Sequence, residues 1–339
     1  MTATSGSRRV AVLGGGSWGT ALARHAALNG VEVRLWVHSE PLALRISASR
    51  ENDRYLPGFP LPAGVTVTSS LAEACAGART LLLAVPSRHC REVLQGARDH
   101  IAPGARVISA SKGIEQVTLL RVSEVIEGVL GRERISDVAA LSGPSFAREV
   151  ASGRPTAIVA AGSLRAAEEA QRLVAGRNLR IYTSPDLVGV EVGGALKNVV
   201  AIAAGVVAGL ELGPNTMAAL ITRGLAEITR LACSLGAQGA TLSGLAGVGD
   251  LILTCTGAQS RNFQVGLLLG RGRRLPEILG GMTMVAEGVD TARSVGDLGR
   301  RHRVSMPISE QVGRVLFESM PPEEAIRELL DRPQRPEQD

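Results

Sequence analysis

The chain has 339 residues, of which 45% are hydrophobic and only 2% aromatic, and its formal net charge is +5. This length exceeds what one hydrophobic core usually supports, so we expect two domains. Few aromatic side chains disfavour single-stranded nucleic-acid binding, which depends on base stacking. The basic residues are scattered, with the densest cluster at 300–303, so a small anionic ligand explains the charge and we expect no nucleic-acid partner.

Three features bear on the cell compartment. The four cysteines are Cys75, Cys90, Cys233 and Cys255. They form no close pair of redox or metal-ligand spacing, so we expect reduced thiols, no metal and a cytoplasmic location. Ser7-Arg8-Arg9 before an apolar run resembles a twin-arginine signal, but four glycines in that run favour another explanation. Residues 199–210 come closest to a membrane span and are shorter than the roughly 18 residues one needs, so we expect none.

A strand, a glycine turn and a helix follow one another near the start of the chain. An apolar run ending at Leu13 leads into Gly14-Gly15-Gly16-Ser17-Trp18-Gly19 and then into a helical pattern. This order fits the dinucleotide fingerprint, in which Gly14 makes the tight turn, Gly16 lets the backbone reach a pyrophosphate and Gly19 allows close packing. The amides at the helix start then face the anion.

The second strand, Val31 to Trp36, bears on which cofactor binds. A site that prefers NAD usually has Asp or Glu at the end of this strand to hold the ribose hydroxyls. Here Trp36, Val37 and His38 follow, with no carboxylate before Glu40. The sequence therefore favours NADP, with dual use of NAD, and His38 as an adenine-side contact. The alternative is that His38 is only a surface turn residue.

Short apolar runs alternate with helical stretches as far as Tyr182. The later runs are Val65 to Thr68, Thr80 to Val85, Arg106 to Ala110, Val138 to Ser142, Thr156 to Ala160 and Leu179 to Tyr182. This alternation predicts a Rossmann-like, mostly parallel sheet with helices on both faces. Ligands bind beyond the carboxyl ends of such strands. Polar clusters lie there at Pro86-Ser87, at 109–113 with Lys112, and at 142–147.

Beyond Tyr182 the apolar period changes toward 3.6, which predicts an all-α C-terminal domain. We expect a dinucleotide-binding domain over 1–184, a helical substrate and catalytic domain over 185–331, and a disordered, proline-broken tail over 332–339. The predicted helices of the second domain are 186–209, 215–235, 261–271, 287–302, 308–319 and 323–331.

Lysine is rare in this chain: Lys112 and Lys197 stand against 35 arginines. Lys197 lies in an apolar helical stretch, where arginine would serve for charge alone but could not release a proton. Desolvation lowers the pKa of a buried ammonium toward neutrality, where it can act as acid or base. The alternative is a partly exposed lysine at a helix end, but the apolar run beyond Asn198 favours burial.

Two further stretches of the second domain carry polar groups. Residues 244–251 form a glycine-rich bend that delivers Asp250, and 254–262 are interpreted as loop, cap and helix start. Ser260 is the expected N-cap, with Arg261 and Asn262 in the first turn. An arginine beside free first-turn amides is a good receptor for a phosphate group.

Taken together, these motifs resemble the bacterial NAD(P)-dependent glycerol-3-phosphate dehydrogenase family over about residues 8–330. The matching strings are Gly14 to Gly19, Ser111-Lys112-Gly113, Leu141 to Ala147, the Lys197 helix, Gly247 to Asp250, Ser260-Arg261-Asn262 and Val285 to Gly288. The resemblance implies reduction of dihydroxyacetone phosphate to sn-glycerol 3-phosphate, a phospholipid precursor.

The resemblance also implies which residues contact each ligand. For the cofactor they are Ser17, Trp18, His38, Lys112, Ala147, Arg261, Val285 and Glu287. For the substrate they are Lys112, Gly143, Ser145, Lys197, Asp250, Ser260, Arg261 and Asn262. Lys197 would transfer the proton and Lys112 would polarise or orient the substrate, whereas Asp250 would hold a hydroxyl or tune Lys197. One departure is Phe263-Gln264, where the family usually continues with basic residues.

Two alternatives stay open at this point. One is a related hydroxyacid dehydrogenase of the same architecture, and the other is a non-catalytic NADP-binding sensor. The Ser260-Arg261-Asn262 cluster disfavours the first, and the two lysines disfavour the second. The small-residue faces of the helical domain suit a homodimer.

Overall fold

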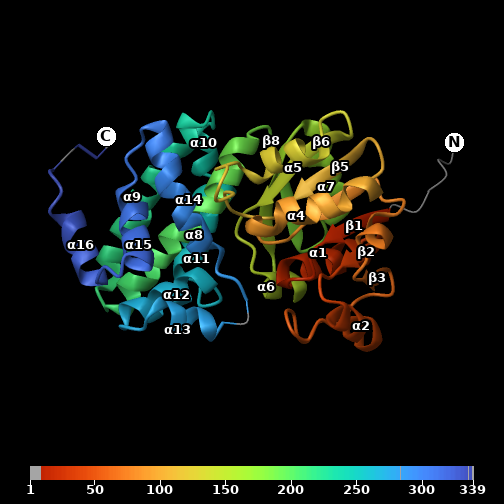
Figure 1. Cartoon of the computed structure of the whole chain (residues 1–339), viewed down its shortest axis with the longest axis horizontal. Helices are drawn as coiled ribbons and strands as arrows, with labels where there is room; N and C mark the ends of the chain where they lie inside the picture. Colours follow the sequence, from red (N-terminus) through yellow and green to blue (C-terminus); the bar gives the residue numbers. More distant parts are fainter. Residues whose placement is uncertain (1–8, 283, 335, 338–339) are drawn as a thin grey trace.

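The computed structural model describes residues 9–282, 284–334, 336 and 337. An N-terminal lobe built on a sheet and a C-terminal lobe of helices lie side by side along the long axis of the molecule (Figure 1). Ser7 and Arg8 lie outside the described residues. Arg9 begins the first strand. The apolar run that follows Arg9, which resembled the core of a signal peptide, forms this strand and the next helix.

Eight strands form the single sheet of the N-terminal lobe. They are β1 (Arg9–Leu13), β2 (Glu32–Trp36), β3 (Val65–Thr68), β4 (Thr80–Leu83), β5 (Ala105–Ser109), β6 (Ile135–Ser142), β7 (Thr156–Gly162) and β8 (Leu179–Ser184). The strand order is β3-β2-β1-β4-β5-β6-β7-β8. Only β6 and β7 pair antiparallel, and the other neighbours are parallel. The mostly parallel sheet is therefore confirmed.

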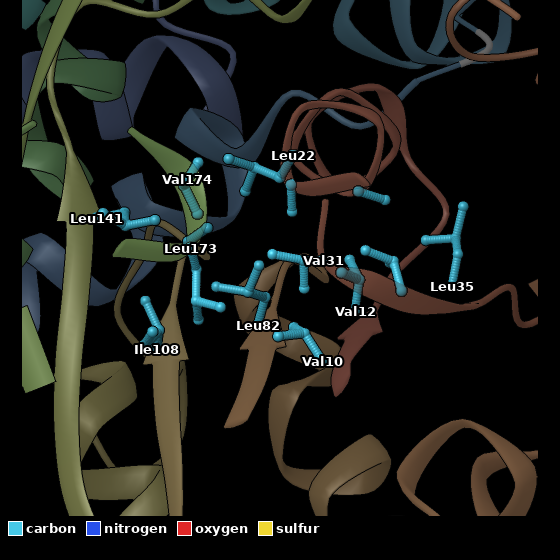
Figure 2. Packing of buried hydrophobic residues seen from close by; sticks show 14 of the residues in the cluster. Val10, Val12, Leu22, Val31, Leu35, Leu82, Ile108, Leu141, Leu173 and Val174 are labelled. Atoms are coloured by element: carbon cyan, nitrogen blue, oxygen red, sulfur yellow. The ribbon is translucent and has the colours of Figure 1, made fainter. Parts of the chain in front are cut away.

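Helices cover both faces of this sheet. They are α1 (Ser17–Leu28), α2 (Glu40–Ser49), α3 (Leu71–Cys75), α4 (Ser87–Ala97), the short η1 (Arg98–His100), α5 (Val122–Leu130), α6 (Ala147–Ala151) and α7 (Leu164–Val174). On one face, Val12 and Leu82 of the sheet pack with Leu22 of α1 and Leu173 of α7 (Figure 2). On the other face, strand residues such as Leu83 pack against α4 and α5. Burial on both sides explains why central strands such as β1 and β4 are continuous apolar runs, whereas the edge strands β3 and β8 alternate between buried and exposed residues.

The described residues of the C-terminal lobe form helices joined by short loops, and none of them forms a strand. Its elements are α8 (Leu187–Gly209), α9 (Gly213–Ser234), α10 (Gly239–Leu242), η2 (Leu245–Gly249), α11 (Asp250–Thr256), α12 (Arg261–Gly270), α13 (Leu275–Gly280), α14 (Glu287–His302), α15 (Pro307–Phe317) and α16 (Pro322–Leu330). The all-α prediction is confirmed. In the tail, the described residues 332–334, 336 and 337 form no helix or strand.

Helix α8 is the centre of this lobe, and glycines bring its backbone into contact with that of α12. A Cβ on Gly205 would lie 2.1 Å from the Phe263 carbonyl oxygen, and one on Gly266 would lie 1.9 Å from the Ile202 carbonyl oxygen. Two stretches, 187–209 and 239–256, are long and apolar enough for a membrane span. The first is 83% buried within the protein, as expected for the core helix of a lobe. The second is 39% buried and is interrupted between α10 and η2, so it is not one continuous helix.

Some predictions for this lobe were wrong. The stretch over 254–262 was expected to begin as a loop, but Thr254 to Thr256 complete α11. The bend at 244–251 contains the π-helical turn η2 and the start of α11. Helices α10 and α13 were also missed. These pieces have four to seven residues, so none is long enough to show a helical apolar period.

Candidate active site

The glycine turn lies where the strand order reverses, because β1 pairs with both β2 and β4. Gly14 has φ +126°, and a Cβ there would lie 2.5 Å from the Ala84 carbonyl oxygen. A Cβ on Gly19 would lie 1.9 Å from the Gly14 carbonyl oxygen. By contrast, a Cβ on Gly16 would have no atom within 4 Å. The turn is therefore closed against the protein at Gly14 and Gly19 and open at Gly16, as a bound pyrophosphate requires.

Helix α1 starts directly from this turn. Gly16 occupies the N-cap position, and within the described residues no side chain caps the helix. The first turn carries no acidic residue. Its free amides are thus available for an anion, which the positive end of the helix dipole also favours.

Three of the residues predicted around the cofactor, His38, Trp18 and Ala147, lie on segments next to this turn. The Gly14 amide donates to the Trp36 carbonyl oxygen at 3.2 Å, and the exposed His38 follows two residues later. The rings of Trp36 and His38 meet edge to face at 5.9 Å. Trp18 and Ala147 pack together against a small apolar cluster at α1 and α6.

A second group forms around one carboxylate, Asp250. The Lys197 ammonium on α8 donates to Asp250 Oδ1 at 2.5 Å and to Thr254 Oγ1 at 2.8 Å. The Lys112 ammonium, from the loop after β5, donates to Asp250 Oδ2 at 2.8 Å. Lys197 is 7% exposed and Asp250 1%. The structure therefore brings both lysines of the chain onto a single buried carboxylate, and the predicted burial of Lys197 is confirmed.

Burial and the neighbouring charges set the protonation of this lysine centre (Lys112, Lys197 and Asp250). Desolvation lowers the pKa of Lys197 to about 8, with a smaller lowering from Lys112, although Asp250 acts in the opposite direction. Burial alone would raise the pKa of Asp250, but the two ammonium groups hold it below its usual range. Asp250 is therefore ionised at neutral pH, and Lys197 can gain or lose a proton close to it.

The starts of α12 and α14 meet beside this centre. The Ser260 hydroxyl accepts from the Phe263 amide at 3.2 Å, which confirms Ser260 as the N-cap. Arg261 donates to the Val285 carbonyl oxygen at 2.6 Å, and Asn262 Oδ1 accepts from the Gly288 amide at 2.9 Å. Arg261 is thus half-buried and tied to the segment before α14, not a free surface arginine.

The unusual pair Phe263-Gln264 has structural contacts. Phe263 packs against the core of the helical lobe, and Gln264 donates to the Ala258 carbonyl oxygen at 3.2 Å. These contacts stabilise the loop that leads into α12. They leave Ser260, Arg261 and Asn262 in place, so the predicted phosphate motif is intact without the extra basic residues.

The remaining predicted residues lie at the end of β6 and at the start of α14. A Cβ on Gly143, which has φ +130°, would lie 2.9 Å from the Ile158 Cα, and a Cβ on Gly194 would lie 2.6 Å from Ser142 Oγ. Ser145 donates to the Gly143 carbonyl oxygen at 2.9 Å. Burial raises the pKa of Glu287, against the attraction of Arg261 and the two lysines, which places this carboxylate in their field.

Two residues of the site were not foreseen from the sequence. Thr254 accepts a hydrogen bond from Lys197 and donates to the Asp250 carbonyl oxygen at 2.6 Å. Its spacing of four residues from Asp250 would have indicated it if α11 had been recognised as a helix. Asn52 donates to Gly15 and Thr20 inside the glycine turn, across 37 and 32 residues of sequence. No local signal could have revealed it.

The glycine turn follows the carboxyl end of β1, and Lys112 of the lysine centre follows that of β5, two places along the same parallel part of the sheet. Open α/β sheets bind their ligands at this edge. A turn open at Gly16 fits a dinucleotide phosphate, and a buried lysine beside a carboxylate fits proton transfer. The fold and the site thus define the class as a two-domain, nicotinamide-dependent oxidoreductase.

Comparison with known proteins identifies the family within this class. Residues 9–168 match the model of the NAD-dependent glycerol-3-phosphate dehydrogenase N-terminus, and residues 186–327 match that of the C-terminus. The chain belongs to the NAD-dependent glycerol-3-phosphate dehydrogenase family.

Relatives cover nearly the whole length of the chain. A glycerol-3-phosphate dehydrogenase [NAD(P)+] from Geobacter metallireducens is 51% identical over 325 residues, which are 96% of this chain and 97% of the relative. One from Bacillus subtilis is 46% identical, over 96% of this chain and 94% of the relative. The crystal structure of glycerol-3-phosphate dehydrogenase from Coxiella burnetii has a TM-score of 0.92 and 39% identity, over 96% of this chain and 99% of that chain.

Dehydrogenases with other substrates share only the fold. A ketopantoate reductase from Ralstonia eutropha superposes with a TM-score of 0.60 at 17% identity. The architecture alone therefore does not decide the substrate, and the residues of the site must.

Proposed function

We propose that this chain catalyses the NAD(P)H-dependent reduction of dihydroxyacetone phosphate to sn-glycerol 3-phosphate, and the reverse oxidation. The observation that carries the proposal is the lysine centre, in which a buried Lys197 of lowered pKa shares Asp250 with Lys112. The names and near-full-length coverage of the relatives support the same activity. The product would serve as a head-group precursor for phospholipids.

In this mechanism Lys197 handles the proton. A bound nicotinamide supplies or accepts the hydride. As the carbonyl carbon of the substrate is reduced, its oxygen becomes negative and must gain a proton. Lys197 donates that proton from Nζ, and in the oxidation it takes the proton back. Asp250 keeps the pKa of Lys197 from falling further than about 8, so the group is still protonated at neutral pH.

Lys112 and Thr254 act beside Lys197. Two ammonium groups and one carboxylate leave the centre with a net positive charge in a water-poor site, which favours a developing oxyanion. Lys112 supplies the charge that polarises or orients the substrate. The Thr254 hydroxyl accepts from Lys197 at 2.8 Å and holds its tip in place.

The substrate phosphate would bind at the start of α12. Arg261, Asn262 and the first-turn amides there form an anion receptor, while Gly143 and Ser145 would contact the substrate from the end of β6. Binding the phosphate at a distance from the reacting carbon fixes the geometry of the carbonyl toward Lys197. Glu287 and Val285, at the start of α14, would contact the cofactor with Lys112 and Arg261.

For the cofactor we propose dual use of NADP and NAD, with NADP favoured. Residues 1–184 would bind it and residues 185–331 would supply most of the substrate site. His38, Ser17, Trp18 and Ala147 would surround its adenine and phosphate portion. We further propose a cytoplasmic location, which the free state of all four cysteines supports. Homodimer formation stays a prediction that analytical ultracentrifugation would test.

A substrate panel tests the proposed activity. The oxidation of NADPH and of NADH is followed by absorbance with dihydroxyacetone phosphate, unphosphorylated dihydroxyacetone and 2-oxo acids. We expect efficient turnover only with the phosphorylated ketone, and a higher kcat/KM with NADPH than with NADH. Preference for a 2-oxo acid would support the hydroxyacid dehydrogenase alternative. Cofactor binding without turnover of any substrate would support the sensor alternative.

The variant Arg261→Ala tests the phosphate site. Charge-assisted hydrogen bonds contribute about 1.5–3 kcal/mol each, so we expect the KM for dihydroxyacetone phosphate to rise roughly 10- to 100-fold. The kcat/KM for unphosphorylated dihydroxyacetone should change far less. Arg271→Ala, at the exposed other end of α12, is the matched control and should leave both constants unchanged. Equal losses with the two substrates would remove Arg261 from the phosphate site.

A further inference from the structure

The glycine turn is hydrogen-bonded on its inner side by Asn52, a residue that was not predicted to belong to the site. Asn52, three residues beyond the end of α2, is 0% exposed. Its Nδ2 donates to the Gly15 carbonyl oxygen and to Thr20 Oγ1, both at 2.8 Å. Its Oδ1 accepts from the Tyr55 amide at 3.3 Å. Because the Tyr55 amide can only donate, it identifies the amide oxygen and confirms that the NH₂ group faces Gly15.

Holding the Gly15 carbonyl also orients the amide that follows it. The carbonyl of Gly15 and the N–H of Gly16 belong to one planar trans peptide, so they point in opposite directions. With the Gly15 oxygen turned inward to Asn52, the Gly16 N–H is turned outward. A Cβ on Gly16 would also have no neighbour within 4 Å, so this residue has open space beside it for the cofactor phosphates.

The second hydrogen bond of Asn52 connects the turn to the helix. Thr20, which is fully buried, donates its own amide to the Gly16 carbonyl oxygen at 2.9 Å. One amide group therefore bridges the peptide before Gly16 and the first turn of α1. This fixes the direction in which the free amides at the start of α1 point relative to the turn.

Asn52 is itself held by a closed loop. The Leu61 amide donates to the Arg50 carbonyl oxygen at 2.6 Å, which joins the two ends of the loop. Leu56, 2% exposed, packs on Ala21 and Ala151. The Leu56 amide donates to the Asn52 carbonyl oxygen at 2.8 Å. Asn52 therefore reaches the turn from an anchored support, not from a free surface loop.

We propose that Asn52 is a positioning residue for the cofactor phosphates, acting through the Gly15–Gly16 peptide and through Thr20. This inference rests on the proposed use of a dinucleotide. It assigns Asn52 a part in cofactor affinity and none in hydride or proton transfer. Loss of its NH₂ group should therefore weaken cofactor binding while the chemistry of the saturated enzyme is kept.

The test compares two identical substitutions at two carbonyl-binding asparagines. In Asn52→Asp the donor becomes an acceptor that faces the Gly15 oxygen. In Asn29→Asp the same change is made at the other end of α1, where Asn29 donates to the carbonyl oxygens of Leu173 and Ala175 at 3.3 and 2.7 Å. The Kd for NADPH is measured by titration calorimetry, together with kcat, both KM values and thermal unfolding.

We expect Asn52→Asp to raise the Kd and KM for NADPH about tenfold or more, because a buried acceptor loses its donor. The kcat at saturation and the KM for dihydroxyacetone phosphate should stay near those of the wild type. Asn29→Asp should keep the wild-type Kd whatever its unfolding temperature. The same Kd in both variants, or a loss shared equally by kcat and both KM values, would overturn the proposal.

A second pair of variants covers the case in which Asn52→Asp does not fold. Thr20→Val keeps the shape of the side chain but removes the hydroxyl that accepts from Asn52, and Thr20→Ser keeps the hydroxyl. We expect a several-fold rise in the Kd for NADPH in the first and a near-normal Kd in the second. Equal Kd values in these two variants would contradict the proposal. A wild-type protein that binds neither NADPH nor NADH would instead refute the proposed function.

Discussion

The glycine turn and the lysine centre are built differently, and we propose that they serve two parts of one reaction, cofactor binding and proton transfer. The turn would present backbone amides to an anion, because Gly14, Gly16 and Gly19 lack side chains. The lysine centre consists of charged side chains from three elements, with Asp250 lying 53 and 138 residues from its two partners. The turn is thus specified by adjacent residues, whereas the centre exists only after the two lobes pack together.

The two regions should also respond differently to substitution. In the turn, the space around each backbone atom matters most. An added methyl group at one glycine can therefore destabilise the fold, whereas at another glycine it lowers only the affinity for the cofactor. In the centre, protonation matters most, and a change that keeps both size and charge can still abolish activity. Three predictions test this contrast.

The largest effect is expected at Lys197. Lys197→Arg keeps the positive charge but cannot release a proton near neutral pH, so kcat should fall about 10²- to 10⁴-fold. Lys112→Arg also keeps its charge, and because we propose only an electrostatic role for Lys112, this variant should lose much less activity. Steady-state kinetics of both variants, with circular dichroism to verify folding, measure the difference. Near-normal turnover in Lys197→Arg would refute the proton-transfer role.

An intermediate effect is expected within the glycine turn. Gly19→Ala places a methyl group 1.9 Å from the Gly14 carbonyl oxygen, so the free energy of unfolding should fall by about 1–3 kcal/mol and cofactor affinity should fall with it. Gly16→Ala has open space around its Cβ and φ −73°, so only cofactor affinity should fall. Urea unfolding and NADPH titration separate the two. Equal destabilisation in both variants would contradict the division into a closed and an open side.

The smallest effect is a pH dependence of the lysine centre. The pKa of Lys197 is lowered to about 8, and the protonated form donates in the reduction. The kcat/KM for reduction should therefore be level below pH 8 and fall about tenfold per pH unit above it, while oxidation should show the opposite dependence. Asp250→Asn removes the carboxylate that raises the pKa of Lys197, so the fall should begin at lower pH. An unchanged profile in this variant would assign the titration to another group.

The sequence predicted those features that depend on residues close together in the chain. All eight strands were predicted, because central strands such as β4 are buried on both faces and read as continuous apolar runs, and the edge strands β3 and β8 keep an alternating apolar pattern. Ser260 was recognised as an N-cap from its place before a helical pattern. Lys197 stood out because the chain uses arginine elsewhere, and its burial followed from the apolar residues around it.

What could not be predicted depends on contacts between distant segments. Helix α11, which contains Asp250, is too short to show a periodic pattern. The sequence therefore did not reveal that Asp250 pairs with both lysines or that Thr254 accepts a hydrogen bond from Lys197. Both contacts depend on how α11 packs against α8. Asn52 reaches Gly15 through a closed loop that no motif marks. In each case the missing information was the tertiary packing that brings remote segments into contact.

The glycine contacts between α8 and α12 have a consequence for substrate choice. Gly205 and Gly266 bring the two backbones together, so no side chain lies between them that could repack and change their separation. Lys197 lies on one of these helices and Arg261 at the start of the other. In the proposed mechanism, the distance between the proton donor and the anion receptor is therefore fixed by the backbone, and we expect a ketone whose charged end is one bond nearer or farther to be a poor substrate.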